Sequence, residues 1–388
     1  MAEGRIKVLI VDDSALMRSL ISKILDETND IIVVGTAMHG GFAMDKIPKL
    51  KPDVIVLDLE MPKVDGLEFL RRRKEAGIDI PVVILSSRAE KGAKITMDAL
   101  ALGASDFITK PSGPISPDIH VVAETLQEMV RGYGRKYRRQ RGDAAFNKMT
   151  APPRRMAETA PPVSRVVSGQ ELGFISISPK IKQKKESITP LRKPDIPEVL
   201  AIGVSTGGPS AVRFLLSKLD EDFSLPVLLV QHMPPGFTKE FAESLDRHCA
   251  VTVTEAVNGD KLEPGHVYVA PGDYHLFAEQ RGSEVFVGLS KDPPVNGHRP
   301  SADVLFESVA RIYQNRSISV IMTGMGRDGA RMIGEVYRQG GITIGQDEES
   351  CVVYGMPRAA SELGVLHMEL PLEDIPVVIN KLASKAKK

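Results

Sequence analysis

The stretch that decides the fold of the first half of the chain is residues 6–25, "IKVLIVDDSALMRSLISKIL". A short apolar run ends in two aspartates, and a helix-length segment with mixed apolar and polar residues follows. Such a run is typical of a buried strand, and it is too short for a signal peptide. Asp13 or Ser14 suits the N-cap of the helix. The stretch therefore predicts a strand, a turn and a helix.

The same pattern recurs up to about residue 130. Helix-length segments alternate with short runs rich in Val and Ile, namely "IKVLIV", "IIVVG", "DVIVLDL", "PVVILSS" and "DFITK". This alternation is the pattern of βαβ units with a parallel sheet. We therefore expect a doubly wound, five-stranded parallel (βα)5 domain of the α/β class, with ligands at the C-terminal ends of its strands.

A second α/β domain is expected from residue 196 onward, where the alternation resumes with "VLAIGVS". Its sheet should be mostly parallel, and "GHVYVAPGDYHLFAE" with "EVFVGLS" predicts an antiparallel hairpin region. Between the domains, residues 131–195 contain 16 Lys and Arg against 5 Asp and Glu, together with seven prolines. That composition predicts a flexible basic linker. The expected organisation is thus 1–130, 131–195 and 196–388.

Composition excludes several classes of protein. The two cysteines, Cys249 and Cys351, form neither a disulfide framework nor a metal-ligand spacing. No apolar run approaches the roughly 18 residues of a membrane span. No helix-turn-helix signature accompanies the basic linker, so nucleic acid is not an expected partner. These features predict a reduced cytoplasmic protein without membrane insertion.

Charged side chains follow three of the strands predicted in the first domain. Asp12 and Asp13 end the first strand, Asp58 ends the third, and Lys110 ends the fifth. A cap or a turn would explain any one of these residues, but not the set. Carboxylates gathered at one sheet edge repel one another unless a hard cation such as Mg²⁺ lies among them. The set predicts a phosphoryl-acceptor site in which one aspartate is the nucleophile and Lys110 neutralises phosphate oxygens.

The segments "VDDS", "LDLEMPKVDGLEFL", "ILSS" and "ITKP" resemble the receiver domain of bacterial response regulators. The resemblance covers about 125 residues, and it implies that Asp58 accepts phosphate with Lys110 beside it. It also implies a magnesium site formed by Asp12, Asp13, Asp58 and the backbone carbonyl of Glu60. Ser86 would supply the switch hydroxyl. Serine stands here where threonine is usual, which retains the hydroxyl.

In the second domain, residues 199–212 read "VLAIGVSTGGPSAV" and place Ser205 between glycines where a helix begins. "GVSTG" matches the G-x-S-x-G nucleophile elbow, in which glycines permit a tight turn and backbone N–H groups face an oxyanion. An anion-binding loop or an ordinary serine turn has a similar sequence. A nucleotide loop is excluded because no lysine follows the glycines.

A serine nucleophile needs a general base, and that base needs an orienting carboxylate. His232 directly follows the apolar run "LPVLLVQ", and Asp328 follows "ISVIMTGMGR". His275 and His298 are competing candidates for the base. The order Ser205, His232, Asp328 differs from that of α/β-hydrolases, which implies a separate α/β architecture with a convergent triad.

Residues 199–388 resemble the catalytic domain of chemotaxis protein-glutamate methylesterases. The segments that carry the resemblance are "IGVSTGGP", "QHMPPGFTKEFAESL", "LEPGHVYVAPGDYH", "VNGHRPSADVLFESVA", "TGMGRDGA" and "SCVVYGMPRAA". The resemblance implies that Ser205 is the nucleophile, His232 the base and Asp328 its orienting partner. It further implies that the backbone N–H of Met325 donates to the oxyanion and that Thr206 is an accessory residue.

Together the two resemblances imply a phosphorylation-activated response regulator that is also a serine carboxylic-ester hydrolase. It would hydrolyse glutamate γ-methyl esters on methyl-accepting chemoreceptors to glutamate and methanol, and would deamidate receptor glutamines. A chemotaxis histidine kinase would supply the phosphate, Mg²⁺ would serve the receiver, and the hydrolase would need no cofactor. If the receiver covers the Ser205 cleft, phosphorylation would uncover it. The alternatives are a non-catalytic, phosphorylation-dependent adaptor and, less favoured, a transcriptional regulator.

Overall fold

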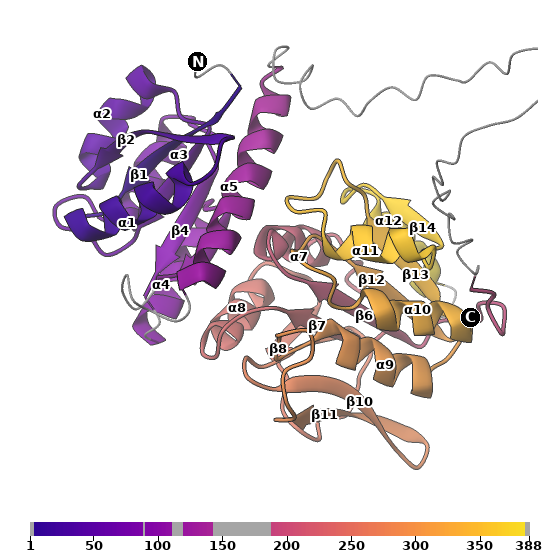
Figure 1. Ribbon diagram of the computed structural model, residues 1–388. Coiled ribbons are helices and arrows are strands. Elements are labelled where there is room, and N and C mark those ends of the chain that lie inside the picture. The colour runs from indigo at the N-terminus through magenta and orange to yellow at the C-terminus, as the bar shows by residue number, and fades with distance from the viewer. Residues whose placement is uncertain (1–3, 88–89, 111–118, 143–187, 385–388) are drawn as a thin grey trace, which may run out of the picture.

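The N-terminal half forms a five-stranded parallel sheet with helices on both faces (Figure 1). The computed structural model describes residues 4–87, 90–110, 119–142 and 188–384. The strands are β1 (Ile6–Val11), β2 (Ile31–Ala37), β3 (Val54–Asp58), β4 (Val82–Ser86) and β5 (Asp106–Thr109). The helices are α1 (Ala15–Asp26), α2 (Gly40–Leu50), α3 (Gly66–Glu75), α4 (Glu90–Ala101) and α5 (Ile119–Gln140). The expected (βα)5 fold is confirmed.

The strands of this sheet are apolar throughout because helices cover both faces. One face packs on α1 and α5, through side chains such as Leu25 and Leu126. The other face packs on α2, α3 and α4, through side chains such as Phe69 and Met97. Ser14 is the N-cap of α1 and accepts a hydrogen bond from the Met17 N–H at 3.3 Å. The Ser14 cap and the two-sided burial of β1 thus explain why this part of the chain forms a strand followed by a helix.

Helix α5 continues to Gln140, well inside the segment predicted to be a flexible linker. The start of that linker at residue 131 is therefore wrong. Tyr133 and Tyr137 are buried, whereas Arg135 and Arg139 are exposed, so the basic residues occupy one side of an amphipathic helix. Composition alone could not distinguish this helix from a solvated tether. Residues 143–187 of the predicted linker lie outside the described residues.

The C-terminal domain contains a seven-stranded parallel sheet in the order β14-β13-β12-β6-β7-β9-β8. Its strands are β6 (Val199–Val204), β7 (Val227–Gln231), β8 (Thr252–Glu255), β9 (His266–Val269), β12 (Ser317–Ile321), β13 (Ile342–Gln346) and β14 (Met368–Leu370). Its helices are α7 (Gly208–Leu216), α8 (Phe237–Asp246), α9 (Ala302–Ile312), α10 (Ala330–Gln339), α11 (Met356–Leu363) and α12 (Ile375–Ala383). The expected mostly parallel α/β domain is confirmed.

The expected antiparallel hairpin consists of β10 (His275–Arg281) and β11 (Glu284–Ser290). Strand β9 was expected beside them, but it pairs in parallel with β7 and β8 in the main sheet. The difference has a physical reason, since Val267 and Val269 are fully buried against the helices that cover the sheet. Alternating and continuous apolar patterns are difficult to separate in a strand of this length.

The strand order brings three loops of the C-terminal domain together. Strand β6 lies in the middle of the sheet, with β7 on one side and β12 on the other. The chain leaves β6 toward β7 and returns later to β12, so this is a point where the direction of the strand order changes. Ligand sites of open parallel sheets form at such points, beyond the C-terminal strand ends. The residues that follow β6, β7 and β12 are therefore the candidates for a site.

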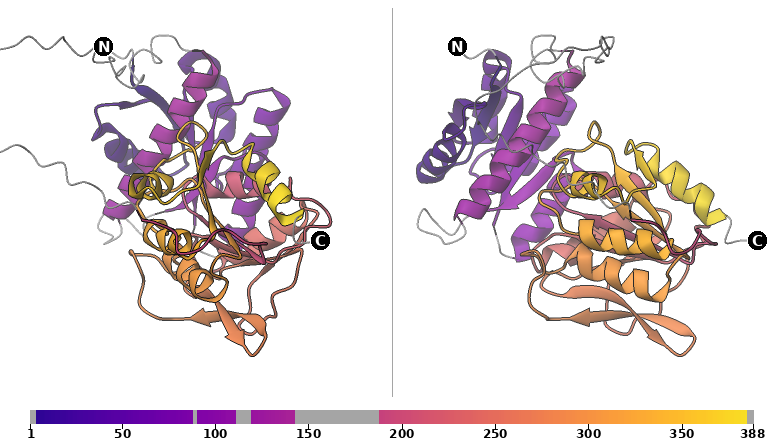
Figure 2. Two further views of the ribbon diagram at one scale, coloured as in Figure 1. Left: turned by 90° about the vertical axis from the view of Figure 1, so that its right-hand side faces the viewer. Right: turned by 45° about the vertical axis from the view of Figure 1, so that its right-hand side comes forward.

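The two domains pack against each other through β5 and α4, which contact α7 and α8, and through α5, whose Lys136 Nζ donates to the Ser350 carbonyl beyond β13 (Figure 2). The ring of Phe107 stacks on that of Phe237 with centroids 4.9 Å apart and an interplanar angle of 8°. Buried apolar residues of both domains consequently form one connected cluster. Within the described part of the chain, no helix is long and apolar enough to cross a membrane.

Candidate active site and phosphorylation site

The sheet of the N-terminal domain gathers an acidic cluster at the C-terminal ends of β1 and β3. Carboxylate oxygens of Asp12, Asp13 and Asp58 lie within 4.8 Å of one another. Asp12 and Asp58 are buried and Asp13 is exposed. Lys110, which follows β5, donates to Asp58 Oδ2 at 2.7 Å and to Asp12 Oδ2 at 3.1 Å. All four residues predicted for this edge are thus brought together.

Burial and charge shape the protonation of this cluster. Burial raises the pKa of Asp58, although its hydrogen bond and ion pair with Lys110 act in the opposite direction. Burial lowers the pKa of Lys110, but Asp58 and Asp12 together hold it above its usual value. A single ammonium group balances only part of the charge of three carboxylates. The donor set, which consists of carboxylate oxygens open to solvent at Asp13, suits a hard divalent cation.

Two further residues predicted for the receiver lie beside this cluster. Ser86 ends β4 and is buried, and its hydroxyl is 2.6 Å from Thr96 Oγ1 of α4. The backbone N–H of Glu60 donates to Asp58 Oδ1 at 3.3 Å, which positions this carboxylate from the β3 loop. Ser86 is therefore bonded to α4 rather than to the carboxylates. The role of the Glu60 carbonyl in metal binding stays a prediction.

Ser205 follows β6 and occupies a tight turn into α7. Gly207, the N-cap of α7, has φ of +81°, a left-handed conformation that favours glycine. The Ser205 N–H donates to the Thr323 carbonyl at 3.0 Å, beyond the end of β12. The Ser205 carbonyl accepts from Gln231 Nε2, at the end of β7, at 3.0 Å. The turn is thus held to both neighbouring strands, which fixes the backbone that presents the hydroxyl.

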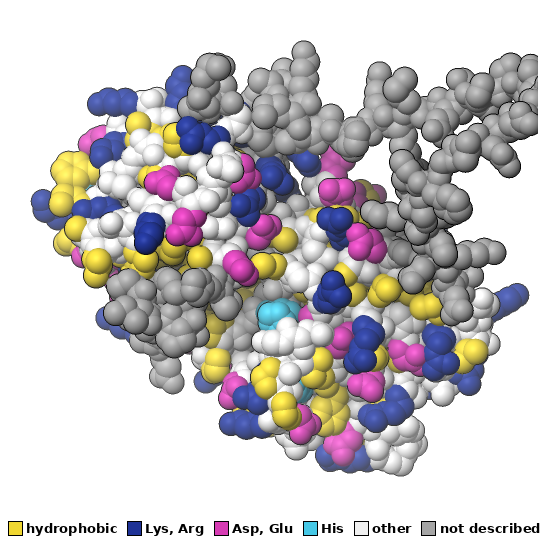
Figure 3. Space-filling view, in the orientation of Figure 1, with side chains coloured by type: hydrophobic (Ala, Val, Ile, Leu, Met, Phe, Trp, Pro, Cys, Tyr) yellow, Lys and Arg dark blue, Asp and Glu magenta, His cyan; other side chains and the backbone are white. Residues whose placement is uncertain are grey.

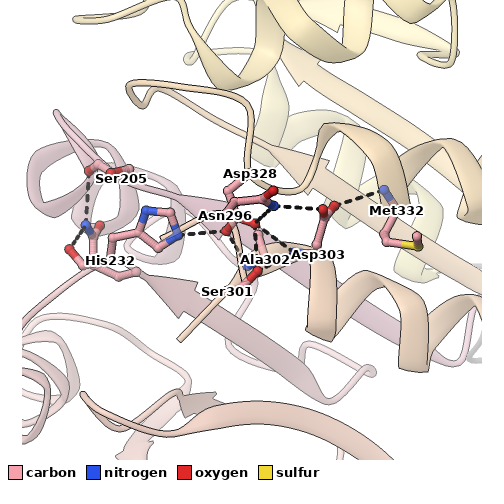
Figure 4. A network of polar contacts seen from close by, with 9 residues as sticks. Ser205, His232, Asn296, Ser301, Ala302, Asp303, Asp328 and Met332 are labelled. Atoms are coloured by element: carbon pink, nitrogen blue, oxygen red, sulfur yellow. Dashed lines mark hydrogen bonds and ion pairs between the residues drawn. The ribbon is translucent and has the colours of Figure 1, made fainter. Parts of the chain in front are cut away.

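His232 follows β7, and its Nε2 is 2.8 Å from Asp328 Oδ2 (Figure 4). Its other ring nitrogen, Nδ1, is buried and has no hydrogen-bond partner among the described residues. In Figure 4 this nitrogen lies on the side of the ring toward Ser205. No hydrogen bond joins Ser205 Oγ to His232 in the described part of the chain, and such bonds are often long before substrate binds. The hydrogen bond between His232 and Asp328 is thus formed, whereas the one between Ser205 and His232 is not.

Asp328 is buried and its two oxygens accept several hydrogen bonds at the start of α9. Oδ2 accepts from the Ala302 N–H at 2.6 Å in addition to facing His232. Oδ1 accepts from Ser301 Oγ at 2.6 Å and from Asn296 Nδ2 at 2.8 Å. Burial raises the pKa of Asp328, but His232, Ser301 and Asn296 outweigh burial and hold this pKa well below its usual range. Asp328 is therefore a carboxylate whose orientation is fixed before any substrate binds.

Ser205 and His232 line a cavity of about 370 Å³ at the boundary between the two domains. Met325 and Thr206 also line it, so every residue proposed for the hydrolase except the buried Asp328 faces one space. Neither the Met325 N–H nor the Thr206 N–H has an acceptor within the described ranges. Free N–H groups next to a hydroxyl can stabilise a tetrahedral oxyanion. The arrangement fits acyl transfer to a serine.

The chain matches two family models. Residues 8–116 match the response regulator receiver domain, and residues 200–379 match the CheB methylesterase model. Over its length the chain is 46% identical to the protein-glutamate methylesterase/protein-glutamine glutaminase of Treponema pallidum, covering 97% of this chain and 96% of that protein. The chain belongs to the protein-glutamate methylesterase/protein-glutamine glutaminase family. The relative of the same name from Treponema denticola is 48% identical, over 97% of this chain and 98% of that protein.

Solved structures of one relative of this family match each domain separately. The CheB methylesterase catalytic domain of Thermotoga maritima is 41% identical over 48% of this chain and 98% of its own, with a TM-score of 0.47. The response regulator domain of Thermotoga maritima CheB is 45% identical over 34% of this chain and 96% of its own, with a TM-score of 0.31.

Sequence reasoning missed the residues that hold the carboxylate in this family member. Asn296 Nδ2 donates to Asp328 Oδ1 and also to Asp303 Oδ2, at 2.8 and 2.9 Å, so one amide bridges two carboxylates (Figure 4). Ser301 is the N-cap of α9 and donates to the same Asp328 oxygen. Asn296, Ser301 and Asp303 all fall in "VNGHRPSADVLFESVA", a segment that the sequence analysis used only for its resemblance to methylesterases. A polar run directly before an apolar helix was the available signal.

The receiver also closes part of this site. Asp106, at the start of β5, accepts a hydrogen bond from the Gly207 N–H at 2.7 Å, two residues after Ser205. The Ser105 carbonyl accepts from Ser210 Oγ at 2.7 Å. Phe107 and Glu124 of the receiver line the same cavity as Ser205. Figure 3 shows charged side chains of both signs interspersed over both domains on one face of the molecule. Hydrogen bonds and the stacked pair Phe107 and Phe237 therefore join the domains.

Proposed function

We propose that this chain is a phosphorylation-activated protein-glutamate methylesterase and protein-glutamine glutaminase of bacterial chemotaxis, acting in the cytoplasm. Its substrates are methylated glutamates and particular glutamines of methyl-accepting chemoreceptors, and a chemotaxis histidine kinase is its phosphodonor. The receiver, which ends with α5 at Gln140, and the hydrolase, residues 196–388, are joined by the segment between them. Membership of the family and the presence of both domains support this function.

The hydrolysis runs through a Ser205 acyl-enzyme. Ser205 Oγ attacks the γ-carbonyl carbon of the substrate while His232 Nδ1 takes the hydroxyl proton. The N–H groups of Met325 and Thr206 hold the negative oxygen of the tetrahedral intermediate. His232 then returns the proton to the leaving oxygen, and methanol departs. A water molecule attacks the acyl-enzyme with His232 again as base, which releases glutamate and restores Ser205.

The same residues account for the glutaminase reaction, in which the leaving group is ammonia instead of methanol. In both reactions Asp328 keeps the proton of His232 on Nε2, so Nδ1 is free to accept a proton from Ser205. The observation that carries the proposal is this pairing: Asp328 Oδ2 lies 2.8 Å from Nε2, and the buried Nδ1 has no partner among the described residues. His275 Nδ1 is also buried without a partner among the described residues, but His275 bonds to the Pro293 carbonyl instead of a carboxylate and does not line the Ser205 cavity.

We assign phosphate acceptance to Asp58, with Lys110 neutralising phosphate oxygens and Ser86 as the switch hydroxyl. Asp12, Asp13, Asp58 and the Glu60 carbonyl would hold Mg²⁺, which supplies positive charge to the incoming phosphoryl group when bound. Phosphorylation adds about two negative charges and strong acceptor oxygens at Asp58. Ser86 now bonds to Thr96 of α4, and α4 belongs to the domain contact. A new acceptor at Asp58 would draw Ser86 away from Thr96 and shift α4.

The receiver inhibits the hydrolase by covering it. This proposal rests on Asp106, Phe107 and Glu124, which belong to the receiver and line the Ser205 cavity. A receptor helix needs access to that cavity, and the receiver stands where the helix would lie. Phosphorylation would weaken the contacts of β5 and α4 and so admit the substrate.

The experiment that tests this function measures methanol released from methylated receptor membranes, with and without a small phosphodonor and Mg²⁺. We expect release without phosphodonor and stimulation by about 5- to 150-fold with it, the range of typical coupling energies. Asp58→Asn should retain the unstimulated rate and lose the stimulation, because it lacks the acceptor oxygen. Absence of methanol under every condition would favour the adaptor alternative.

A pH dependence follows from Asp106. Burial raises the pKa of this carboxyl to about 7 from its ordinary 3.8, although hydrogen bonds from Gly207, Phe107 and Tyr133 oppose the rise. In water, after the domains separate, Asp106 would ionise at its ordinary pKa. The docked state therefore binds the proton more tightly, so docking is strongest below pH 3.8 and weakens until about pH 7. We expect the unstimulated rate, divided by the phosphodonor-stimulated rate, to rise at least about threefold with pH over this range.

Two variants separate this effect from the titration of the catalytic groups. Asp106→Ala and Ser210→Ala each remove one hydrogen bond between the domains, but only the first removes a titrating group. Ser210→Ala should keep the pH dependence of the rate ratio and Asp106→Ala should lose it. If both variants keep it, another group is responsible.

A further inference from the structure

A second histidine lies directly against the proposed base. The ring of His298 stacks on that of His232 with centroids 3.9 Å apart and an interplanar angle of 14°. His298 comes from the segment between β11 and α9, and it lines the cavity with Ser205. His275, the other candidate base, donates from Nε2 to the Pro293 carbonyl at 3.2 Å. His298 thus contacts the ring of the proposed base, but it is His232 that bonds to Asp328.

We propose that His298 is a positioning residue for the hydrolase reaction. Its ring fixes the plane of the His232 imidazole, so that Nδ1 stays on the side of Ser205 while Nε2 stays bonded to Asp328. The inference rests on the proposed function and adds a residue to it. His298 acts through His232, and no step of the reaction passes through its own nitrogens.

The geometry explains why a second contact is needed. The hydrogen bond between Nε2 and Asp328 anchors His232 at one atom, and a ring held at one atom can still tilt about that bond. A stacked ring opposes tilting over its whole face, because tilting would break van der Waals contact. Two constraints of different kinds therefore define the direction of Nδ1. Precise direction matters because a misplacement of about 1 Å can cost about 10²-fold in rate.

The stack also suits the charge that His232 acquires during the reaction. When Nδ1 takes the Ser205 proton, His232 becomes an imidazolium, and a neutral aromatic face beside it is attractive. Burial and the neighbouring His232 lower the pKa of His298 to about 4, although the Asp328 carboxylate opposes this. Near neutral pH His298 is therefore uncharged. Besides the two histidines, the ionisable side chains that line this cavity are Glu124 and the buried Asp106, both of the receiver.

Ring contact rather than hydrogen bonding accounts for the role of His298. Its side chain makes no hydrogen bond to any residue in the described ranges, whereas its backbone pairs with Val295. An aromatic ring without nitrogens should therefore serve as well. This distinguishes the inference from an acid, a base or a substrate ligand at position 298, each of which would need a ring nitrogen.

The test compares His298→Ala, His298→Leu and His298→Phe with the wild type in the full chain, measuring kcat and KM for methanol release with phosphodonor present. Alanine and leucine should lower kcat about tenfold, the effect of roughly 1.4 kcal/mol of lost ring contact, and leave KM within about twofold. Phenylalanine should restore kcat to within about threefold of the wild type. His266→Ala is the matched control. His266 also stacks on an aromatic ring, that of Tyr268, but it begins β9 and so lies at the sheet edge opposite to Ser205. This variant should leave kcat unchanged.

Each other result overturns the inference. An unchanged kcat in the leucine variant would show that the ring is dispensable, and a slow phenylalanine variant would show that the nitrogens are required. A raised KM with normal kcat would make His298 a substrate contact instead. Leucine keeps the apolar volume, so the comparison of leucine with phenylalanine holds even if alanine unfolds the protein. If the wild type itself releases no methanol, the proposed function fails and this inference with it.

Discussion

Replacing Ser205 by alanine will abolish methanol release, lowering kcat by at least about 10⁴-fold. The loss is large because the acyl-enzyme forms on Ser205 Oγ, and no other hydroxyl can take its place in the turn after β6. The nearest alternative, Thr206, is buried and its carbonyl is held by Thr323 Oγ1 at 2.9 Å. Free N–H groups of Met325 and Thr206 would remain, so a small residual rate from oxyanion stabilisation is expected. Methanol release measured with phosphodonor present gives the result directly.

The same variant provides its own control in the other domain. Asp58 lies on the receiver sheet and should be phosphorylated to the same extent in Ser205→Ala as in the wild type. Ser217→Ala, which alters an exposed serine at the end of α7, is the matched substitution and should leave the rate unchanged. Substantial esterase activity in Ser205→Ala would remove the serine mechanism, and the adaptor alternative would then lead.

Replacing Asp328 by asparagine should lower kcat by about 10³- to 10⁴-fold while the domain stays folded. Oδ1 of Asp328 accepts bonds from Asn296 and Ser301, so the asparagine oxygen will take this position. Its amide nitrogen must then face His232 and donate to Nε2. That donation places the imidazole proton on Nδ1, where His232 cannot accept a proton from Ser205. The variant changes which nitrogen of His232 carries the proton, and it also removes the acceptor of the Ala302 N–H, which now bonds to Oδ2 at 2.6 Å.

A neighbouring carboxylate supplies the comparison for this prediction. Asp303 accepts from Asn296 and from the Met332 N–H, and it does not contact His232. Asp303→Asn should therefore reduce kcat by no more than about tenfold, through the loss of one orienting hydrogen bond. Thermal unfolding of both variants should be measured alongside. Equal losses in Asp303→Asn and Asp328→Asn would mean that both carboxylates only stabilise the loop.

The fold was predictable because its signals are local. Val- and Ile-rich runs of strand length define buried parallel strands, and the residues that follow them lie at the C-terminal sheet edge whatever the order of the strands. Asp12, Asp58 and Lys110 can be grouped on this ground from the sequence alone. The placement of β9 and the length of α5 could not be predicted in this way. A short apolar strand has the same local pattern in a hairpin as in a parallel sheet, and a basic helix resembles a flexible linker in composition.

By itself the sequence determined which residue types end which strands, and hence the acidic edge, the serine turn and the two domains. Only the tertiary structure decided which histidine meets Asp328, because β7 and β12 flank β6 and bring His232 and Asp328 within 2.8 Å across 96 residues of chain. It also decided that His298 stacks on His232 and that Asp106 bonds to Gly207 in the other domain. The physical reason is that hydrophobic runs specify that a strand forms, whereas strand order and domain packing depend on contacts between segments far apart in the chain.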